Sequence, residues 1–366
     1  MDRYAWIPEH QQHAAYSLAH ADNLIERAGR LVLEHTRKGT VTLDDVVSGT
    51  TVALTVTGVA PLPQAVARLT SDALNQLRST LEHVLYAEVE HRVEVPLTNE
   101  QARSLEIPAT LAADKLRDWA TRKPRKEIAV LQPETDLYRR IAHLQPFQRR
   151  DSDAHPLKVL AEYTNHSKHR APAVAAVQVG ATIPDQPSDG FQVVEPPGHP
   201  IQVGDILARG PVGRISTGSL FPKVSILRPH SRTWHILIHE LRDLESWVRR
   251  IALPMLITGT TEVDPLPPHL DITVGHADFG TALAAADPVP AADRLDEILK
   301  AGIAREALPD LLRTHPDGAQ HGQALSAWAA SLSDDEAVQK LERLKNCDPR
   351  TLNTVVRTMI DEALKV

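Results

Sequence analysis

The sequence predicts a mainly α protein with a β insert (α+β), with a helical core domain over residues 1–257 and a C-terminal helical domain over residues 291–366. Three observations support this fold class. Apolar residues recur at helical spacing over long stretches, most clearly in residues 71–91. Between about residues 173 and 235 the pattern changes to short apolar runs separated by Gly, Pro and Asp, which is typical of a small β-rich segment. Helical periodicity then returns in the C-terminal domain.

The N-terminal part of the chain is expected to hold one strand among several helices. Val52, Leu54 and Val56 alternate with Thr and Ala, so residues 50–59 are predicted to be a strand. Residues 91–96 have a shorter strand-like pattern. The other periodic stretches are predicted helices, at residues 9–37, 65–69, 71–91, 99–105, 109–120 and 136–144.

The helix at residues 71–91 carries the most polar functional groups. Ser71 or Asp72 is expected to cap its start. Its buried stripe is predicted to be Leu74, Leu77, Leu81, Val84 and Leu85. The face opposite this stripe holds an amide, a carboxylate and a phenol, with a guanidinium and an imidazole flanking them: Asn75, Glu82 and Tyr86, then Arg78 and His83.

A second informative helix is expected at residues 155–170, because Pro156 suits a first helical turn and Pro172 stops the helix. After the β insert at about residues 173–235, residues 237–256 are predicted to return to helix. Residues 258–290 are rich in Pro and Gly, so they are predicted to be a linker to the C-terminal domain.

Composition excludes several classes of protein. The 366 residues include 40 basic and 47 acidic ones, and the formal net charge of −7 excludes a globally basic nucleic-acid binder. Cys347 is the only cysteine, so a disulfide within the chain and a Cys-rich zinc site are both excluded, and a cytoplasmic location is expected. The chain has no signal-peptide pattern and no apolar run of about 18 residues, so no membrane contact is expected.

Charge is distributed unevenly along the chain. Between Lys115 and Arg170 there are 13 Lys or Arg and seven Asp or Glu residues, together with four of the histidines. A basic patch with several imidazoles favours an RNA- or phosphate-binding surface, because phosphate charge dominates such affinity. The alternative is a solvated helical face whose charge is compensated by acidic neighbours.

Arg78 and His83 suggest metal-independent RNA cleavage, in which an imidazole moves a proton and a guanidinium holds the scissile phosphate. On one helix these side chains lie about 140° apart, so they would converge more easily across a homodimer or against a second element. The alternative is structural: Arg78 pairs with Glu82 at i, i+4, and His83 is a boundary residue.

Asn165, Lys168, His169 and Arg170 form a second candidate site, for binding of substrate. The functional hypothesis pairs these residues with Arg78 and Glu82 across a helix–helix groove. Two structural alternatives stay open: the cations complement the end of the helix dipole, or Glu82 is a buried ion-pair partner of Lys168 or Arg170.

Metal and cofactor sites are not expected. His235 and His239 have the i, i+4 spacing of metal ligands, but the internal Glu of a metalloprotease helix is absent and a third ligand is not evident. The Gly-rich stretch 210–219 lacks the Gly-Lys-Ser/Thr of a phosphate-binding loop.

Three ordered elements resemble a widespread group of uncharacterised bacterial proteins. Residues 74–84 resemble the group's NLRxxLDHL helix, residues 145–147 its QPY element, and residues 165–170 its N-x-DKHR element. The present chain has Glu82 for Asp, Phe147 for Tyr and Ser167 for Asp. The resemblance covers about residues 15–255 and leaves the acidic C-terminal domain outside.

The Arg-x4-His helix is also similar, more distantly, to the R-x4–6-H signature of HEPN-type ribonuclease domains of toxins and antiviral systems. In those domains the signature usually lies near the last helix of a bundle, whereas here it lies early. The resemblance implies Arg78 and His83 as the catalytic pair and Glu82 as their orienting group. The competing hypothesis is a non-catalytic binding or scaffold protein whose C-terminal domain docks a protein partner.

Overall fold

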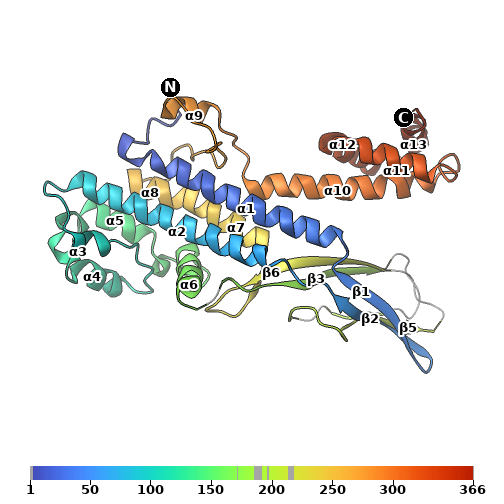
Figure 1. Ribbon diagram of the computed structural model, residues 1–366, viewed down its shortest axis with the longest axis horizontal. Coiled ribbons are helices and arrows are strands. Elements are labelled where there is room, and N and C mark those ends of the chain that lie inside the picture. Colours follow the sequence, from blue (N-terminus) through green and yellow to red (C-terminus); the bar gives the residue numbers. More distant parts are fainter. Residues whose placement is uncertain (1–2, 171, 185–191, 196–197, 213–217, 366) are drawn as a thin grey trace. The chain divides into compact units, whose positions relative to one another are not determined.

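The computed structural model describes residues 3–170, 172–184, 192–195, 198–212 and 218–365. The predicted fold class is confirmed: the protein is mainly helical and contains two small antiparallel sheets (Figure 1). The chain divides into two compact units, residues 1–292 and residues 293–366. Within the described residues, no helix has both the length and the apolar character that crossing a membrane requires.

Two long antiparallel helices, α1 (His13–Arg37) and α2 (Gln64–Arg92), form the centre of the first unit (Figure 1). The predicted stripe of α2 is confirmed, since all five of its apolar side chains are buried. The expected cap at Ser71 or Asp72 is wrong, because no helix breaker separates residues 65–69 from the rest of α2. The Ser71 hydroxyl instead accepts a hydrogen bond from the Ala173 amide at 2.8 Å.

Short helices follow α2: α3 (Asn99–Arg103), α4 (Ala113–Thr121), α5 (Asp136–His143) and α6 (Pro156–His169). The strand expected at residues 91–96 is wrong, because α2 continues to Arg92 and the residues after it pair with no strand. Residues 106–111, expected to be partly helical, form an extended segment between α3 and α4.

The β insert builds both sheets, but it shares one of them with the N-terminal strands. The first sheet has the order β1-β2-β5-β4, with strands Val41–Ser48, Thr51–Val59, Ile206–Pro211 and Gln192–Val193. The second has the order β3-β6-β7, with strands Ala175–Pro184, Gly218–Leu227 and Trp234–Ile236. The predicted strand at residues 50–59 is confirmed as β2, whereas its hairpin partner β1 was not predicted.

The helix predicted at residues 237–256 is present with one irregularity. It consists of α7 (Leu237–Trp247), a π-helical turn (Val248–Ala252) and α8 (Leu253–Thr258). The π turn ends two residues before Pro254, which has no N–H to donate to the preceding helical turn. The widened turn thus accommodates the proline without ending the helix.

Residues 258–290 are not a linker. They belong to the first unit, where Leu266 joins the main core and Leu270 packs with α1 and with α9 (Phe279–Ala284). The buried Asp22 of α1 accepts a hydrogen bond from the Ala291 amide at 2.6 Å and contacts His269 at 3.3 Å. Proline-rich composition therefore indicates irregular backbone here, but not a free connection.

The second unit is a small helical bundle with its own core. It contains most of α10 (Ala291–Arg313), then α11 (Gly322–Ser331), α12 (Asp334–Asn346) and α13 (Leu352–Ala363). Its buried side chains include Leu308, Leu312, Leu325, Trp328, Met359 and Ile360. This core is built from residues 304–363 alone, so the bundle has a hydrophobic core of its own.

The start of α6 is held by a buried histidine, and this makes a testable prediction. The Nδ1 atom of His155 accepts a hydrogen bond from the Leu157 amide at 3.1 Å. Burial, with a smaller contribution from the charge of Arg149, lowers the pKa of His155 from 6.5 to about 4. Between these values the unfolded chain binds a proton that the folded chain does not. The free energy of unfolding is therefore expected to fall as the pH drops through this window, by at most about 3 kcal/mol.

A His155→Asn variant separates this effect from other acid titrations. Asparagine can still cap the helix but cannot take up the proton. Urea denaturation at about pH 7 and about pH 4.5 is expected to show a smaller loss of stability for the variant than for the wild type. Equal pH dependence of the two proteins would contradict the assignment.

Candidate functional site

Arg78 lies on α2 and is almost fully buried, with 8% of the residue exposed. Its Nε donates to Glu82 Oε1 at 2.8 Å, and its Nη2 donates to the Ile107 carbonyl at 2.6 Å. Its third nitrogen, Nη1, is buried and has no hydrogen-bond partner within the described part of the chain. A buried donor left unpaired costs about 1–3 kcal/mol, a cost that a ligand or a water molecule nearby could offset.

Ile107, which accepts the bond from Arg78, belongs to the extended segment 106–111. Gln145, from the QPF element, holds this segment as well. Its Oε1 accepts hydrogen bonds from the amide and the hydroxyl of Thr110, both at 3.0 Å. Its Nε2 donates to the carbonyl of Pro108 at 3.0 Å and to that of Ile141 at 3.2 Å. The fully buried side-chain amide therefore fixes the extended segment 106–111 to α5, while Arg78 fixes the segment to α2.

The third motif element, residues 165–170, overlaps the end of α6, and this helix presents a polar stripe of five side chains. They occur at positions i, i+4, i+7, i+8 and i+11, which lie on one face of a helix: Lys158, Glu162, Asn165, His166 and His169. The opposite face is buried and packs into the core with Leu157, Leu160 and Tyr163. Spacing along the helix thus separates the core face from a functional face.

Two neighbouring cavities follow this stripe. The first, of about 260 Å³, is lined by Arg78, by residues of segment 106–111 and by Lys158, Glu162 and Asn165. The second, of about 220 Å³, is lined by Glu162, Asn165, His166, His169, Arg170 and Pro229. Because they share Glu162 and Asn165, we treat them as one groove, the α6 groove. All three motif elements meet here, since Arg78 and Asn165 line the groove and Gln145 holds segment 106–111, which forms one wall.

Buried polar contacts fix the orientation of α6. On its core side, the Tyr163 hydroxyl donates to Glu240 Oε1 at 3.2 Å, and Arg228 forms a two-bond pair with the same carboxylate, each bond 2.7 Å long. Burial, and the charge of Glu240, raise the pKa of Tyr163 far above its usual range. Near α2, the Ser167 hydroxyl bonds to Asn75 Oδ1 at 3.3 Å. The groove-facing stripe therefore rests on a rigid support.

The two ends of the groove differ in charge. In the first cavity the cations are already paired, Arg78 with Glu82 and Lys158 with Asp153 at 2.7 Å. A hydrogen bond from Lys158 and its charge lower the pKa of Asp153. The second cavity combines two imidazoles and the exposed Arg170 with a single carboxylate. The carbonyl end of α6 disfavours an anion, so anion binding here would depend on these side chains.

Other predicted site residues lie outside the groove. His83 is exposed on another side of α2, with its ring centroid 6.4 Å from that of His13 on α1. Burial, and the nearby charge of His83, contribute to a lowered pKa for His13. Lys168 is exposed and lines neither cavity. The structure thus places Arg78 and Asn165 in the first cavity, and Asn165, His169 and Arg170 in the second. Glu82 is linked to the groove through its bond with Arg78, and His83 lines neither cavity.

No metal site is evident in the part of the chain that the structure describes. Within it, no group of three or more His, Cys, Asp or Glu side chains is placed to hold an ion. His235 Nδ1 lies 3.8 Å from Glu240, but that carboxylate is occupied by Arg228 on both oxygens. His239 is exposed on α7.

A larger cavity, of about 800 Å³, lies elsewhere in the first unit, between the N-terminal segment and α9. Its ionisable side chains are Tyr4, Glu9 and Asp278. Asp278 is already used as the cap of α9, because it accepts the Thr281 amide at 2.7 Å. Size alone would favour this cavity, but it contains neither the motif residues nor a cationic group, so the α6 groove is the better candidate.

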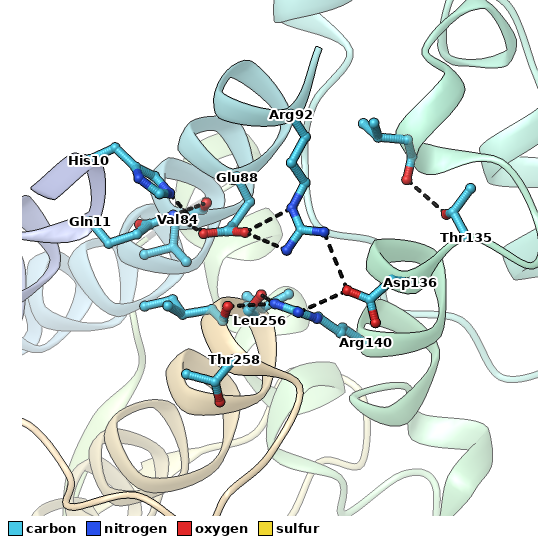
Figure 2. Close-up of polar contacts among 12 residues, drawn as sticks. His10, Gln11, Val84, Glu88, Arg92, Thr135, Asp136, Arg140, Leu256 and Thr258 are labelled. Atoms are coloured by element: carbon cyan, nitrogen blue, oxygen red, sulfur yellow. Dashed lines mark hydrogen bonds and ion pairs between the residues drawn. The ribbon is translucent and has the colours of Figure 1, made fainter. Parts of the chain in front are cut away.

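A second polar network lies at the C-terminal end of α2, as Figure 2 shows. The buried Glu88 accepts bonds from His10 and Gln11 on one side and from Arg92 on the other, at 2.9–3.0 Å. Arg92 also contacts Asp136 at 3.3 Å, and Asp136 pairs with Arg140 at 2.8 Å. This network joins α2 to α5, and Arg140 carries it to the carbonyls that end α8.

Sequence reasoning missed Lys158, Glu162 and His166 as groove residues, and it missed the wall formed by segment 106–111. The helical spacing of polar residues in 158–169 could have identified the first three. Segment 106–111 contributes backbone carbonyls, apolar side chains and the single carboxylate of Glu106, and these form no periodic pattern in the sequence. Searches of protein-family models, of curated proteins and of solved structures found no match for this chain.

Proposed function

We propose that this protein binds single-stranded RNA in the α6 groove. The observation that carries the proposal is the junction of two cavities: the first has a mainly polar lining of donors and acceptors beside a few apolar side chains, and the second is lined by His166, His169 and Arg170. The first suits a nucleobase, whose edges need both kinds of hydrogen-bonding group, and the second suits a phosphate. Together the cavities reach the size of small-ligand sites, about 300–1,000 Å³.

The chemistry of the groove favours RNA over a purely anionic ligand. Carboxylates at Glu106 and Glu162 would repel a ligand whose charge lay along the whole groove. A nucleotide matches this distribution better, because its base is neutral and its phosphate is charged. On one wall of the groove the half-buried Ala109 and the exposed Leu111 offer an apolar surface against which a base can pack, whereas Ile107 itself is buried in the core.

A HEPN-like ribonuclease with Arg78 and His83 as its pair is a second candidate. The exposure of His83 and the neighbouring imidazole of His13 favour it. The buried Arg78–Glu82 pair favours instead the non-catalytic alternative, in which Arg78 supports the fold. Cleavage by a His83→Ala variant compared with wild type would decide between these two roles.

The test of RNA binding is the affinity of an Arg170→Ala variant. Arg170 is exposed and lines the second cavity. We expect its guanidinium to contact a phosphate. Anisotropy of a fluorescent single-stranded RNA in EDTA should show about ten-fold weaker binding, because a charge-assisted contact of about 1.4 kcal/mol is lost. The slope of log affinity against log salt, which is negative, should become smaller in magnitude by about 0.7.

Arg139→Ala is the matched control, because Arg139 is an exposed arginine of α5 that lines neither cavity. Its affinity should stay within about two-fold of wild type. The proposal fails if the wild type does not bind RNA at low salt, or if the two variants weaken binding equally.

A further inference from the structure

We infer that the α6 groove also cleaves the RNA, with Glu162 and His169 as the acid–base pair; this inference rests on the RNA-binding function proposed above. Both side chains line the second cavity, together with Arg170. They are neither Arg78 nor His83, so the inference places any chemistry on α6 and not on α2. A carboxylate, an imidazole and a guanidinium in one cavity supply a base, an acid and a phosphate clamp.

Helical geometry places this pair on opposite sides of a bound phosphate. Glu162 and His169 are seven residues apart, so they share a face of α6 and are separated by about 10 Å along its axis. Asn165 and His166 lie between them on the same face and line the same cavity. A phosphodiester seated over these two residues would have the carboxylate on one side and the imidazole on the other.

The reaction needs no metal, oxidant or second substrate. The Glu162 carboxylate takes the proton of the ribose 2′-hydroxyl, and the 2′-oxygen forms a bond to phosphorus. The bond from phosphorus to the 5′-oxygen breaks, and the His169 imidazolium gives its proton to that oxygen. Arg170 pairs with the non-bridging oxygens, whose charge is greatest in the transition state. The products are a 2′,3′-cyclic phosphate and a 5′-hydroxyl.

The positions of Glu162 and His169 in the groove decide which of them acts as the base and which as the acid. Glu162 is half-buried at the junction of the two cavities, next to where the base would lie, and hence near the ribose. His169 is exposed in the last turn of α6, next to Arg170 and toward the end of the groove. The ribose hydroxyl and the leaving oxygen of one nucleotide step have this same order along the strand.

The experiment is cleavage of a 5′-labelled single-stranded RNA in EDTA by the full-length protein. Glu162→Gln and His169→Asn should each lower the cleavage rate at least about 100-fold, the usual effect of removing a general acid or base. Their RNA affinities should stay within about three-fold of wild type. Mass spectrometry of the product should find the cyclic phosphate, and a DNA of the same sequence should be bound but left intact.

A matched control is His143→Asn, an exposed histidine of α5 that lines neither cavity and should cleave at the wild-type rate. Circular dichroism checks that each variant is folded.

Three outcomes would overturn the inference. RNA that is bound by the wild type but stays intact leaves the binding proposal in place and removes the catalytic one. Cleavage that is lost in His83→Ala but kept in His169→Asn moves the chemistry to α2. A wild type that does not bind RNA at all refutes both the binding proposal and this inference.

Discussion

Arg78→Ala is expected to lower the free energy of unfolding by about 3–5 kcal/mol, the range for removing one partner of a buried ion pair. The variant leaves the Ile107 carbonyl without its donor and the Glu82 carboxylate without its counterion. Glu82 retains 23% of its side-chain exposure and can regain some water, so the lower end of the range is expected. Urea denaturation followed by circular dichroism measures the loss.

Arg68→Ala is the matched control, because Arg68 is an exposed arginine on the same helix. Its effect should be within about 0.5 kcal/mol. A double-mutant cycle of Arg78→Ala with Glu82→Gln should show that the two losses are not additive, because both changes break the same pair. A loss below about 1 kcal/mol for Arg78→Ala would mean that the guanidinium does not support the fold.

The expected loss of stability affects every activity assay of the Arg78→Ala variant. If the variant is destabilised as expected, part of its lost activity will come from unfolded chain. Loss of RNA cleavage in Arg78→Ala therefore identifies a catalytic role only at a temperature where the variant is fully folded. His169 and Arg170 are exposed, so their variants do not carry this ambiguity.

The helices could be predicted because each buries one face. The stripe of α2 and the buried residues of α6 recur at helical spacing, and this local pattern is enough to locate both elements. The pairing of β2 with β5 joins residues 51–55 to residues 206–211, and no local pattern encodes such a contact. For the same reason segment 258–290 was mistaken for a linker, since the contact of its His269 with Asp22 joins residues far apart along the chain.

The candidate site was predicted in part. Arg78 and Asn165 were singled out as site residues and do line one cavity. His83 was paired with Arg78 on the Arg-x4-His pattern, and because a helix turns them about 140° apart, a homodimer or a second element was expected to bring them together. Lys168 was grouped with Asn165 and His169 on the N-x-DKHR resemblance, yet it lies about 120° around α6 from Glu162. Proximity along a helix is a poor guide to a shared site unless the spacing is three, four or seven residues.

Glu88→Gln is the second substitution with a large expected effect, a loss of about 3 kcal/mol in the free energy of unfolding. The glutamate is buried at 3% exposure and accepts two bonds from Arg92, one from His10 and one from Gln11 (Figure 2). The amide keeps the shape but removes the charge, and its NH₂ group faces donors where the carboxylate had acceptors. Arg92 retains Asp136, which limits the loss.

Glu90→Gln makes the same chemical change two residues away on α2. Glu90 is exposed and accepts one bond, from the Tyr86 hydroxyl at 3.2 Å, so its replacement should change stability by less than about 0.5 kcal/mol. Comparable losses for the two variants in urea denaturation would show that burial of the Glu88 network contributes nothing of its own.

The Glu88→Gln variant also tests whether the shape of the α6 groove depends on contacts that lie far from it. Through Asp136 and Arg140 it positions α5, and α5 is followed by Gln145, which holds the wall of the groove. Gln145 has four hydrogen bonds of its own to that wall and to α5. Folded Glu88→Gln protein should therefore bind RNA with nearly the wild-type affinity despite its lower stability. If its affinity falls as well, then the wall is placed by the whole of α5, and the groove and the Glu88 network form a single cooperative structure.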